Sequence, residues 1–269
     1  MFSKYNKPFL FLFFTLFSLF FLVPSFYADS KVSLILAYED KVSFPYYLGN
    51  GKDVLAAKPG TSVEIIKLLE KKLNVSIRFV RHPWKRCLKA MEHNEVDGTF
   101  NASFKEARLK MGRYPFKEGK VDRSRRLLTL SYGFYKLKGS KADWNGKNFT
   151  DLQGNIGVVL GYSVEKDLKE KGFPVDTAPN TQASLDKLLR KRVNLIAGSE
   201  SQIDSYIRNY PRYSEVVKLK KPWKIKASYL MLSHKFVKEH PDLTEKIWDS
   251  IAVLRESKEV QAIYDKYYQ

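Results

Sequence analysis

Residues Trp84 to Arg108 read WKRCLKAMEHNEVDGTFNASFKEAR and carry the clearest indication of the fold class. Pro83 precedes this stretch and suits the first turn of a helix, in which Trp84, Leu88 and Met91 recur one turn apart. A strand is expected at 96–100, a polar loop at 102–106, and an arginine follows at 108. A helix that leads directly into a short apolar strand is typical of an α/β protein.

The same alternation of strands and helices surrounds this stretch and recurs further along the chain. Upstream, strands are expected at 32–38 and 75–79, and the helix between them opens on a capping-box pattern, Thr61-Ser62-Val63-Glu64. Downstream, the expected strands are 156–160, 175–178 and 193–197, and the expected helices start at Ser163, a candidate cap, and Thr181. This spacing predicts right-handed crossovers and parallel sheets.

Two such sheets in one chain predict two lobes. Ligands of open parallel sheets lie beyond the carboxyl ends of the strands, where helix amino termini offer free N–H groups. A cleft between two such edges suits a small anionic or zwitterionic ligand. The tail 240–269 is expected to be helical and to pack on the first lobe, because Leu243, Ile247, Ile251 and Leu254 form one apolar stripe.

Composition argues against several kinds of site. The chain has 269 residues, a net charge of +18, one cysteine and four histidines. Cys87 alone cannot form an intramolecular disulfide or a cysteine-based zinc cluster, and the histidines form no HExxH pair. We therefore expect neither a metal site nor a cofactor.

The first thirty residues have the features of a secretory signal. Lys4 and Lys7 precede the apolar run 8–23, which is short for a membrane span. Cleavage after Ser30 places Ala28 and Ser30 at the two positions that a signal peptidase reads. We expect residues 1–30 to be a signal peptide and the mature chain to be periplasmic; an uncleaved membrane anchor is the alternative.

Short motifs in both halves carry a family resemblance. They are Trp84, Leu88-Lys89-Ala90, Val96-Asp97-Gly98, Lys105-Glu106-Ala107-Arg108, Asp151-Leu152-Gln153-Gly154, Ile156-Gly157-Val158 and Gly161-Tyr162-Ser163. In order and spacing they resemble the family 3 periplasmic solute-binding proteins, receptors of polar amino-acid ABC importers. The resemblance covers residues 31–269 and implies an α/β, two-lobed periplasmic binding protein type II fold with a ligand cleft between the lobes. The expected bounds are 31–121 and 230–269 for the first lobe, and 122–229 for the second.

The resemblance also implies a ligand site. Arg108 matches the arginine that holds a ligand carboxylate, and a guanidinium is suited to grip a carboxylate through two parallel hydrogen bonds. Ser103 and Asn101 match positions beside that arginine. Ser163, with the backbone of Gly161, matches the carboxylate contact of the second lobe. The plainer alternatives are a surface arginine and an ordinary helix-capping serine.

Aromatic residues are expected around the same cleft. Trp84 matches an aromatic wall, although an aromatic at helical spacing also suits the core. Pro45 aligns with a proline of the family's first loop, which brings Phe44, Tyr46 and Glu39 near the cleft mouth. There Phe44 or Tyr46 stacks on a ligand cation or ring, or only packs the loop.

One departure from the family pattern leaves the ligand open. Family members that bind amino acids place an aspartate after the last strand of the second lobe, where it accepts the α-ammonium. Here that position falls on Ser199, with Glu200 next to it, and Asn194 stands where an aspartate is common in the preceding strand. Glu200 is a candidate substitute. An amine-free carboxylate, a modified amino acid and a short peptide are the alternatives to an amino acid.

We expect a monomeric, non-enzymatic receptor that captures a small polar, carboxylate-bearing ligand by lobe closure and presents it to an ABC permease. A module that senses its ligand without an importer is an alternative. An enzyme similar to cyclohexadienyl dehydratases, with Glu39 and Glu200 as an acid/base pair, is another. The basic runs 123–126 and 218–226 are interpreted as solvated surface, with anion steering or contact with anionic lipid as alternatives. No nucleic-acid partner is expected.

Overall fold

The structure is a computed structural model that describes residues 1–2 and 31–268. The signal-peptide prediction falls almost wholly on residues 3–30, outside the described part. Residues from Lys31 onward form one compact unit. No helix of the described part combines the length and the apolar character needed to cross a membrane.

Helices and strands alternate along the chain as the sequence predicts. The helices are α1 (Thr61–Leu73), α2 (Trp84–Glu92), α3 (Ser163–Glu170), α4 (Thr181–Leu189), α5 (Glu200–Asn209), α6 (His234–Glu239), α7 (Pro241–Arg255) and α8 (Lys258–Tyr268), with short 3-10 turns η1 (Glu106–Arg108), η2 (Arg123–Arg125) and η3 (Pro211–Tyr213). The strands are β1 (Ser33–Glu39), β2 (Ser76–His82), β3 (Gly98–Ser103), β4 (Phe116–Lys117), β5 (Lys120–Val121), β6 (Leu128–Leu137), β7 (Asp143–Trp144), β8 (Phe149–Thr150), β9 (Ile156–Val159), β10 (Val175–Ala178), β11 (Leu195–Ser199), β12 (Val216–Lys218) and β13 (Lys224–Leu232).

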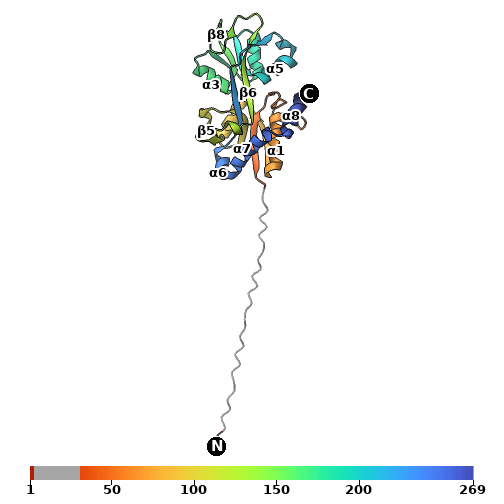
Figure 1. Ribbon diagram of the computed structural model, residues 1–269, viewed down its shortest axis with the longest axis vertical. Helices are drawn as coiled ribbons and strands as arrows, with labels where there is room; N and C mark the ends of the chain where they lie inside the picture. Colours follow the sequence, from red (N-terminus) through yellow and green to blue (C-terminus); the bar gives the residue numbers. More distant parts are fainter. Residues whose placement is uncertain (3–30, 269) are drawn as a thin grey trace. The chain divides into compact units, whose positions relative to one another are not determined.

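Two parallel ladders confirm the predicted βαβ units. In the first lobe, which holds α1, α2 and α6 to α8, β1 pairs in parallel with both β2 and β3. In the second lobe, which holds α3 to α5, β9 pairs in parallel with both β10 and β11. Figure 1 shows α3 and α5 at one end of this unit and α1, α6, α7 and α8 at the other.

Two long antiparallel strands join the ladders into one sheet, in the order β10-β9-β11-β6-β13-β3-β1-β2. Strand β13 pairs with β6 over Lys224–Ser228 and then with β3 over Ser228–Leu232. In the other direction β6 continues past β13 to pair with β11. Figure 1 shows β6 running between the two ends of the unit. Rotation of one lobe against the other therefore has to bend these two strands.

The helical tail packs on the first lobe as predicted, because α7 and α8 both contact α1. It consists of two helices, since α7 ends at Arg255 and α8 begins at Lys258. On α7 the expected stripe is largely present: Ile247, Ile251 and Leu254 are buried, together with Trp248.

Two predicted helix caps are wrong. The N-cap of α1 is Gly60, whose φ of 122° and close approach to the Tyr46 carbonyl exclude a side chain. Glu64, the other half of the predicted capping box, instead accepts hydrogen bonds from Lys266 and Tyr267 of α8. The N-cap of α3 is Tyr162, so Ser163 is the first helical residue and its hydroxyl is free for a different contact.

Candidate functional site

A small cavity lies where the first lobe, the second lobe and β6 meet. Its volume is about 30 Å³, which is room for one or two water-sized groups. It is lined by Tyr47, Trp84, Asn101, Ser103, Arg108, Tyr132, Tyr162 and Ser163. Five of the residues expected at the ligand site therefore come together here.

Arg108 forms hydrogen bonds with both lobes. It ends η1, is 6% exposed, and its guanidinium donates to the Ser103 carbonyl at 2.8 Å and to the Gly161 carbonyl at 2.9 Å. The guanidinium also lies over the Trp84 ring, 5.4 Å from its centroid. Arg108 is thus a buried cation at the junction of the lobes and not a surface arginine.

Gly161 meets Arg108 through its carbonyl. The Trp84 indole N–H donates to the same oxygen at 3.2 Å, while the Gly161 amide donates to Glu165. Trp84 also packs with the buried Cys87 and Met91, so it serves both as core residue and as cavity wall.

A β-bulge places Asn101 on the cavity. Thr99 of β3 pairs with Met231 and Ala102 with Tyr229, so two residues of β3 stand opposite one residue of β13. Asn101 is one of the two, with a left-handed φ of 58°. The side-chain oxygen of Asn101 accepts a hydrogen bond from the Ser62 hydroxyl at 3.1 Å, which leaves the side-chain amide nitrogen as a donor.

Two polar atoms of this lining have no hydrogen-bond partner among the described residues. They are the Asn101 amide nitrogen and the hydroxyl of Ser103, a residue that is 2% exposed. Buried polar groups in native proteins are nearly always paired, so both atoms point to an occupant of the cavity.

A cluster of charged residues borders the cavity on the side of Ser163. The Lys226 ammonium donates to the Ser163 hydroxyl at 2.9 Å and forms an ion pair with Asp167 of α3, as does Lys105 of the first lobe. Burial lowers the pKa of Lys226 to about 8, against the opposing effect of Asp167. Burial alone would raise the pKa of Asp167, but the two lysines outweigh it and hold that pKa below its ordinary value.

Glu39 lies at the end of β1, behind the cavity wall, and is 2% exposed. Its carboxylate accepts hydrogen bonds from the hydroxyls of Tyr47 and Tyr162. Burial is the largest influence on this group and raises its pKa to about 7. The hydrogen bond from Tyr162 crosses from the second lobe to the first.

Besides Gly161 and Glu39, four more of the expected site residues lie outside the cavity lining: Tyr46, Phe44, Ser199 and Glu200. The Tyr46 hydroxyl accepts from Ser201 of α5 at 3.2 Å, and Ser201 also contacts the Ser199 hydroxyl at 3.1 Å. Phe44 packs edge-on against Tyr268 of α8.

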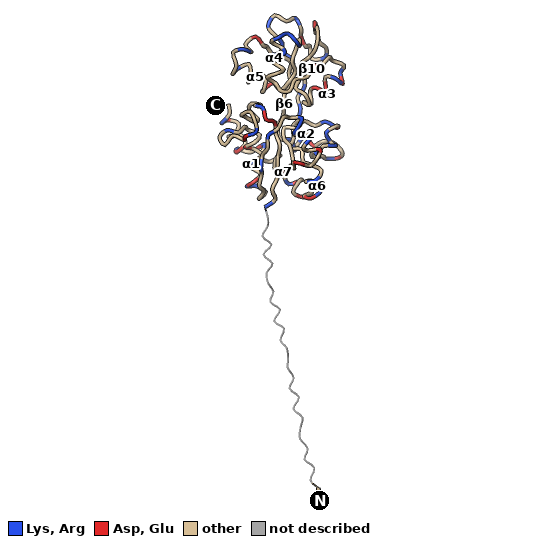
Figure 2. Tube along the Cα trace, turned by 180° about the vertical axis from the view of Figure 1, so that it is seen from behind, with Lys and Arg blue, Asp and Glu red and all other residues tan. Residues whose placement is uncertain are grey.

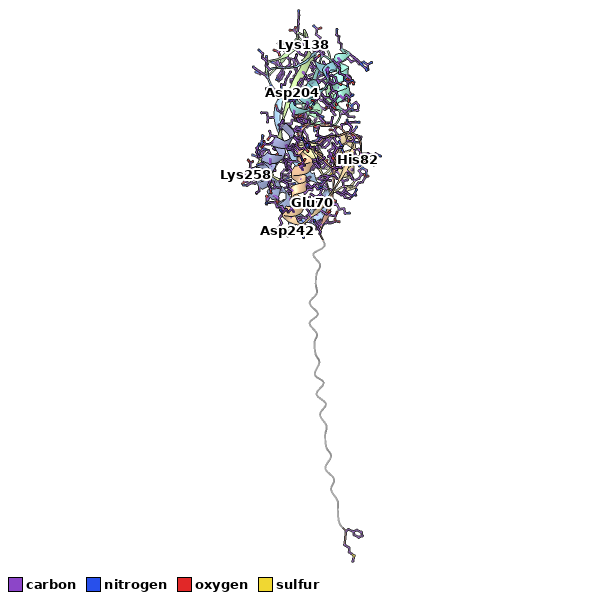
Figure 3. The ribbon with its side chains drawn as sticks, turned by 90° about the vertical axis from the view of Figure 1, so that its right-hand side faces the viewer. Glu70, His82, Lys138, Asp204, Asp242 and Lys258 are labelled. Atoms are coloured by element: carbon purple, nitrogen blue, oxygen red, sulfur yellow. The ribbon has the colours of Figure 1, made fainter. Side chains whose placement is uncertain are left out.

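Glu200 extends over Gly133 of β6 towards Lys218, at 3.6 Å. Lys218 also pairs with Asp204, which Figure 3 labels in the second lobe. Glu39 and Glu200 therefore have separate partners, and the structure does not bring them together as a pair.

Sequence reasoning missed several residues of the site. Tyr162 stands between the quoted Gly161 and Ser163, so its position alone was a signal. Tyr47 and Tyr132 gave none, since a tyrosine in a loop or a strand usually only packs. Lys226 belongs to a run interpreted as solvated surface, yet its side chain is only 12% exposed. Figure 2 shows that Lys and Arg occur throughout both lobes, so composition alone could not single out one of them.

Fold and geometry together define a two-lobed protein of the periplasmic binding protein type, with a small polar cavity between the lobes. The chain belongs to the bacterial extracellular solute-binding proteins, family 3, whose model matches residues 56–269. No curated protein resembles it closely enough in sequence to count as a match.

Solved structures share the fold at low sequence identity. A histidine kinase sensor domain with similarity to periplasmic binding proteins has a TM-score of 0.71 at 14% identity, over 89% of this chain and 97% of its own. An ancestral arginine-binding protein bound to glutamine has a TM-score of 0.68 at 18% identity, over 88% and 98%. The GluR0 ligand-binding core from Nostoc punctiforme, in complex with L-glutamate, has a TM-score of 0.67 at 14% identity, over 87% and 99%.

Proposed function

We propose that this chain is a periplasmic receptor that binds a small carboxylate-bearing ligand between its lobes and presents it to an ABC permease as a monomer. The observation that carries the proposal is Arg108, a buried guanidinium on the cavity with one N–H directed to each lobe. A carboxylate at this point accepts two parallel hydrogen bonds from the guanidinium, the geometry for which arginine is suited.

Ligand binding and lobe closure are coupled in this proposal. Arg108 and Trp84 contact Gly161 across the lobes, and Tyr162 contacts Glu39, and these contacts border the cavity. Lys105 to Asp167, Ser201 to Tyr46 and Gln202 to Val42 are further contacts between the lobes. A ligand held by groups of both lobes binds the closed arrangement better than the open one and shifts the population towards it.

A sensing role is the second candidate. The similarity of this chain to a histidine kinase sensor domain favours it, because closure on a ligand can signal to a partner protein as well as to a permease. Permease and ATPase genes beside the gene for this chain favour transport, and their absence favours sensing.

The test is a ligand screen with a paired variant. Thermal unfolding of residues 31–269 is followed with amino acids, small carboxylates and short peptides, and native mass spectrometry of the fresh protein searches for a co-purified molecule. Arg108→Ala is expected to lose the stabilisation by any ligand found. Arg192→Ala removes an exposed arginine and is expected to retain it. Full affinity in Arg108→Ala would show that the site is elsewhere.

A further inference from the structure

The cavity is rich in hydrogen-bond donors. Arg108 has guanidinium N–H groups beyond the two that are bonded, and the Asn101 amide nitrogen and Ser103 hydroxyl are unpaired within the described residues. The Lys226 ammonium reaches the cavity edge through Ser163. These groups all complement an oxygen that accepts hydrogen bonds.

No carboxylate appears among the described residues that line the cavity. Each carboxylate nearby has other partners. Asp167 is held by Lys105 and Lys226, Glu165 by Lys169 and the Gly161 amide, Glu200 by Lys218, and Glu39 by Tyr47 and Tyr162. Of these, Glu39 contacts two residues of the lining, Tyr47 and Tyr162, and its raised pKa of about 7 leaves it largely protonated below neutral pH.

An ammonium group would therefore be poorly accommodated. The hydroxyls of the lining can accept a hydrogen bond from it, but among the described lining residues no carboxylate balances its charge, and two cations, Arg108 and Lys226, lie close by. An ammonium removed from water without a partner loses affinity, whereas a carboxylate, hydroxyl or keto oxygen finds donors.

From this arrangement we infer that the ligand is an organic acid without an amino group: a carboxylate whose remaining polar atoms are hydrogen-bond acceptors. The inference rests on the proposed function and narrows the ligand class of the same site.

Calorimetry on residues 31–269 at pH 6, where Glu39 is largely protonated, tests the inference with matched pairs, each amino acid beside its 2-oxo acid. Small pairs such as lactate beside alanine and glutarate beside glutamate extend the set. At least one amine-free acid is expected to bind roughly 10- to 100-fold more tightly than its amino counterpart. Amino acids that bind equally well or better overturn the inference and leave the proposed function standing. Failure of every acid of both kinds overturns both.

Asn101→Asp supplies the carboxylate that the lining lacks. Aspartate tolerates the left-handed backbone of residue 101, so the fold is expected to persist, as circular dichroism checks. The variant is expected to bind the amine-free acid at least about 10-fold more weakly. Asn155→Asp makes the same change at an exposed position and is expected to leave affinity unchanged.

Ser103→Ala is a second variant, which removes a donor without adding charge. It is expected to weaken binding of the acid roughly 5- to 10-fold. Unchanged affinity in both Asn101→Asp and Ser103→Ala contradicts the inference.

Discussion

At the scale of single residues, Glu39 is a buried carboxyl group whose pKa is raised by folding. It is buried against two tyrosine hydroxyls, and Arg81, also buried, donates to its backbone carbonyl rather than to its carboxylate. The charged form of Glu39 therefore lacks a direct ion pair, and burial raises its pKa to about 7.

Glu39→Gln is expected to change how stability depends on pH. Because the folded-state pKa lies above the ordinary value of 4.5, the folded chain holds the proton more tightly, and stability falls as pH rises from about 4.5 to 7. Between pH 5 and 8 the wild type should lose about 2 to 3 kcal/mol more than the variant, measured by urea unfolding.

The exposed Glu95 provides the control for this measurement. Glu95→Gln should follow the pH profile of the wild type, since this side chain is in water in both states. A Glu39→Gln profile that parallels the wild type would mean that Glu39 is ionised in the folded protein at pH 5.

The element that shapes the site is the bulge in β3. Asn101 has a left-handed φ, which a residue with a Cβ adopts at a cost and glycine adopts freely. Asn101→Ala and Asn101→Gly both remove the contact with Ser62, so their difference isolates the backbone. Asn101→Ala should be the less stable by about 1 kcal/mol in chemical unfolding. Equal stability would show that the backbone at residue 101 relaxes.

A second element-scale feature is the ion cluster that joins α3, β13 and the loop after β3. Asp167→Asn leaves Lys105 and Lys226 facing each other without their shared carboxylate, and the free energy of unfolding should fall by about 3 kcal/mol. Adding Lys226→Gln should recover part of the loss.

The control for this cluster is Glu170. Its side chain is 55% exposed and lies 3.7 Å from the Lys105 ammonium, so Glu170→Gln should change stability by less than about 1 kcal/mol. Equal effects of Asp167→Asn and Glu170→Gln would contradict the importance of burial at Asp167.

At the scale of the whole molecule, local pattern predicted both parallel ladders. An apolar run such as 156–160 indicates a buried strand, and an apolar stripe indicates the buried face of a helix. Both patterns can be recognised from the local sequence alone. The strands that join the lobes were not predicted. Strand β13 begins with a lysine-rich segment at Lys224 that is typical of surface, and its burial depends on β6, a strand almost a hundred residues earlier.

The site was also predicted only in part, because local sequence pattern does not show which distant segments come into contact. Arg108, Ser103 and Asn101 lie within one contiguous motif, which the resemblance identifies. The other features of the site depend on contacts between segments that are distant in the sequence. Glu64 accepts a hydrogen bond from Lys266 of α8 and does not cap its own helix, and Lys226 donates to the Ser163 hydroxyl. No periodicity in the sequence reports such pairs.

The small volume of the cavity predicts that the lobes lie farther apart in a complex with a ligand than they do in the present structure. About 30 Å³ admits a water-sized group, so an organic acid requires a wider spacing than the present one. In a crystal structure with the bound acid, the Arg108 nitrogen should lie farther from the Gly161 oxygen than its present 2.9 Å. A complex with this hydrogen bond intact would contradict the prediction.

The Gly161 carbonyl has a consequence for affinity. It takes a hydrogen bond from the guanidinium to which we assign the ligand carboxylate in our proposal, so the main chain would compete with that ligand within the same molecule. Only molecules in which Arg108 is released from the Gly161 oxygen can bind the ligand. The smaller this fraction of molecules is, the weaker the apparent affinity becomes. Since a backbone oxygen cannot be removed by mutation, the strength of this competition can be tuned only through its neighbours, above all Trp84, whose indole holds that oxygen in place.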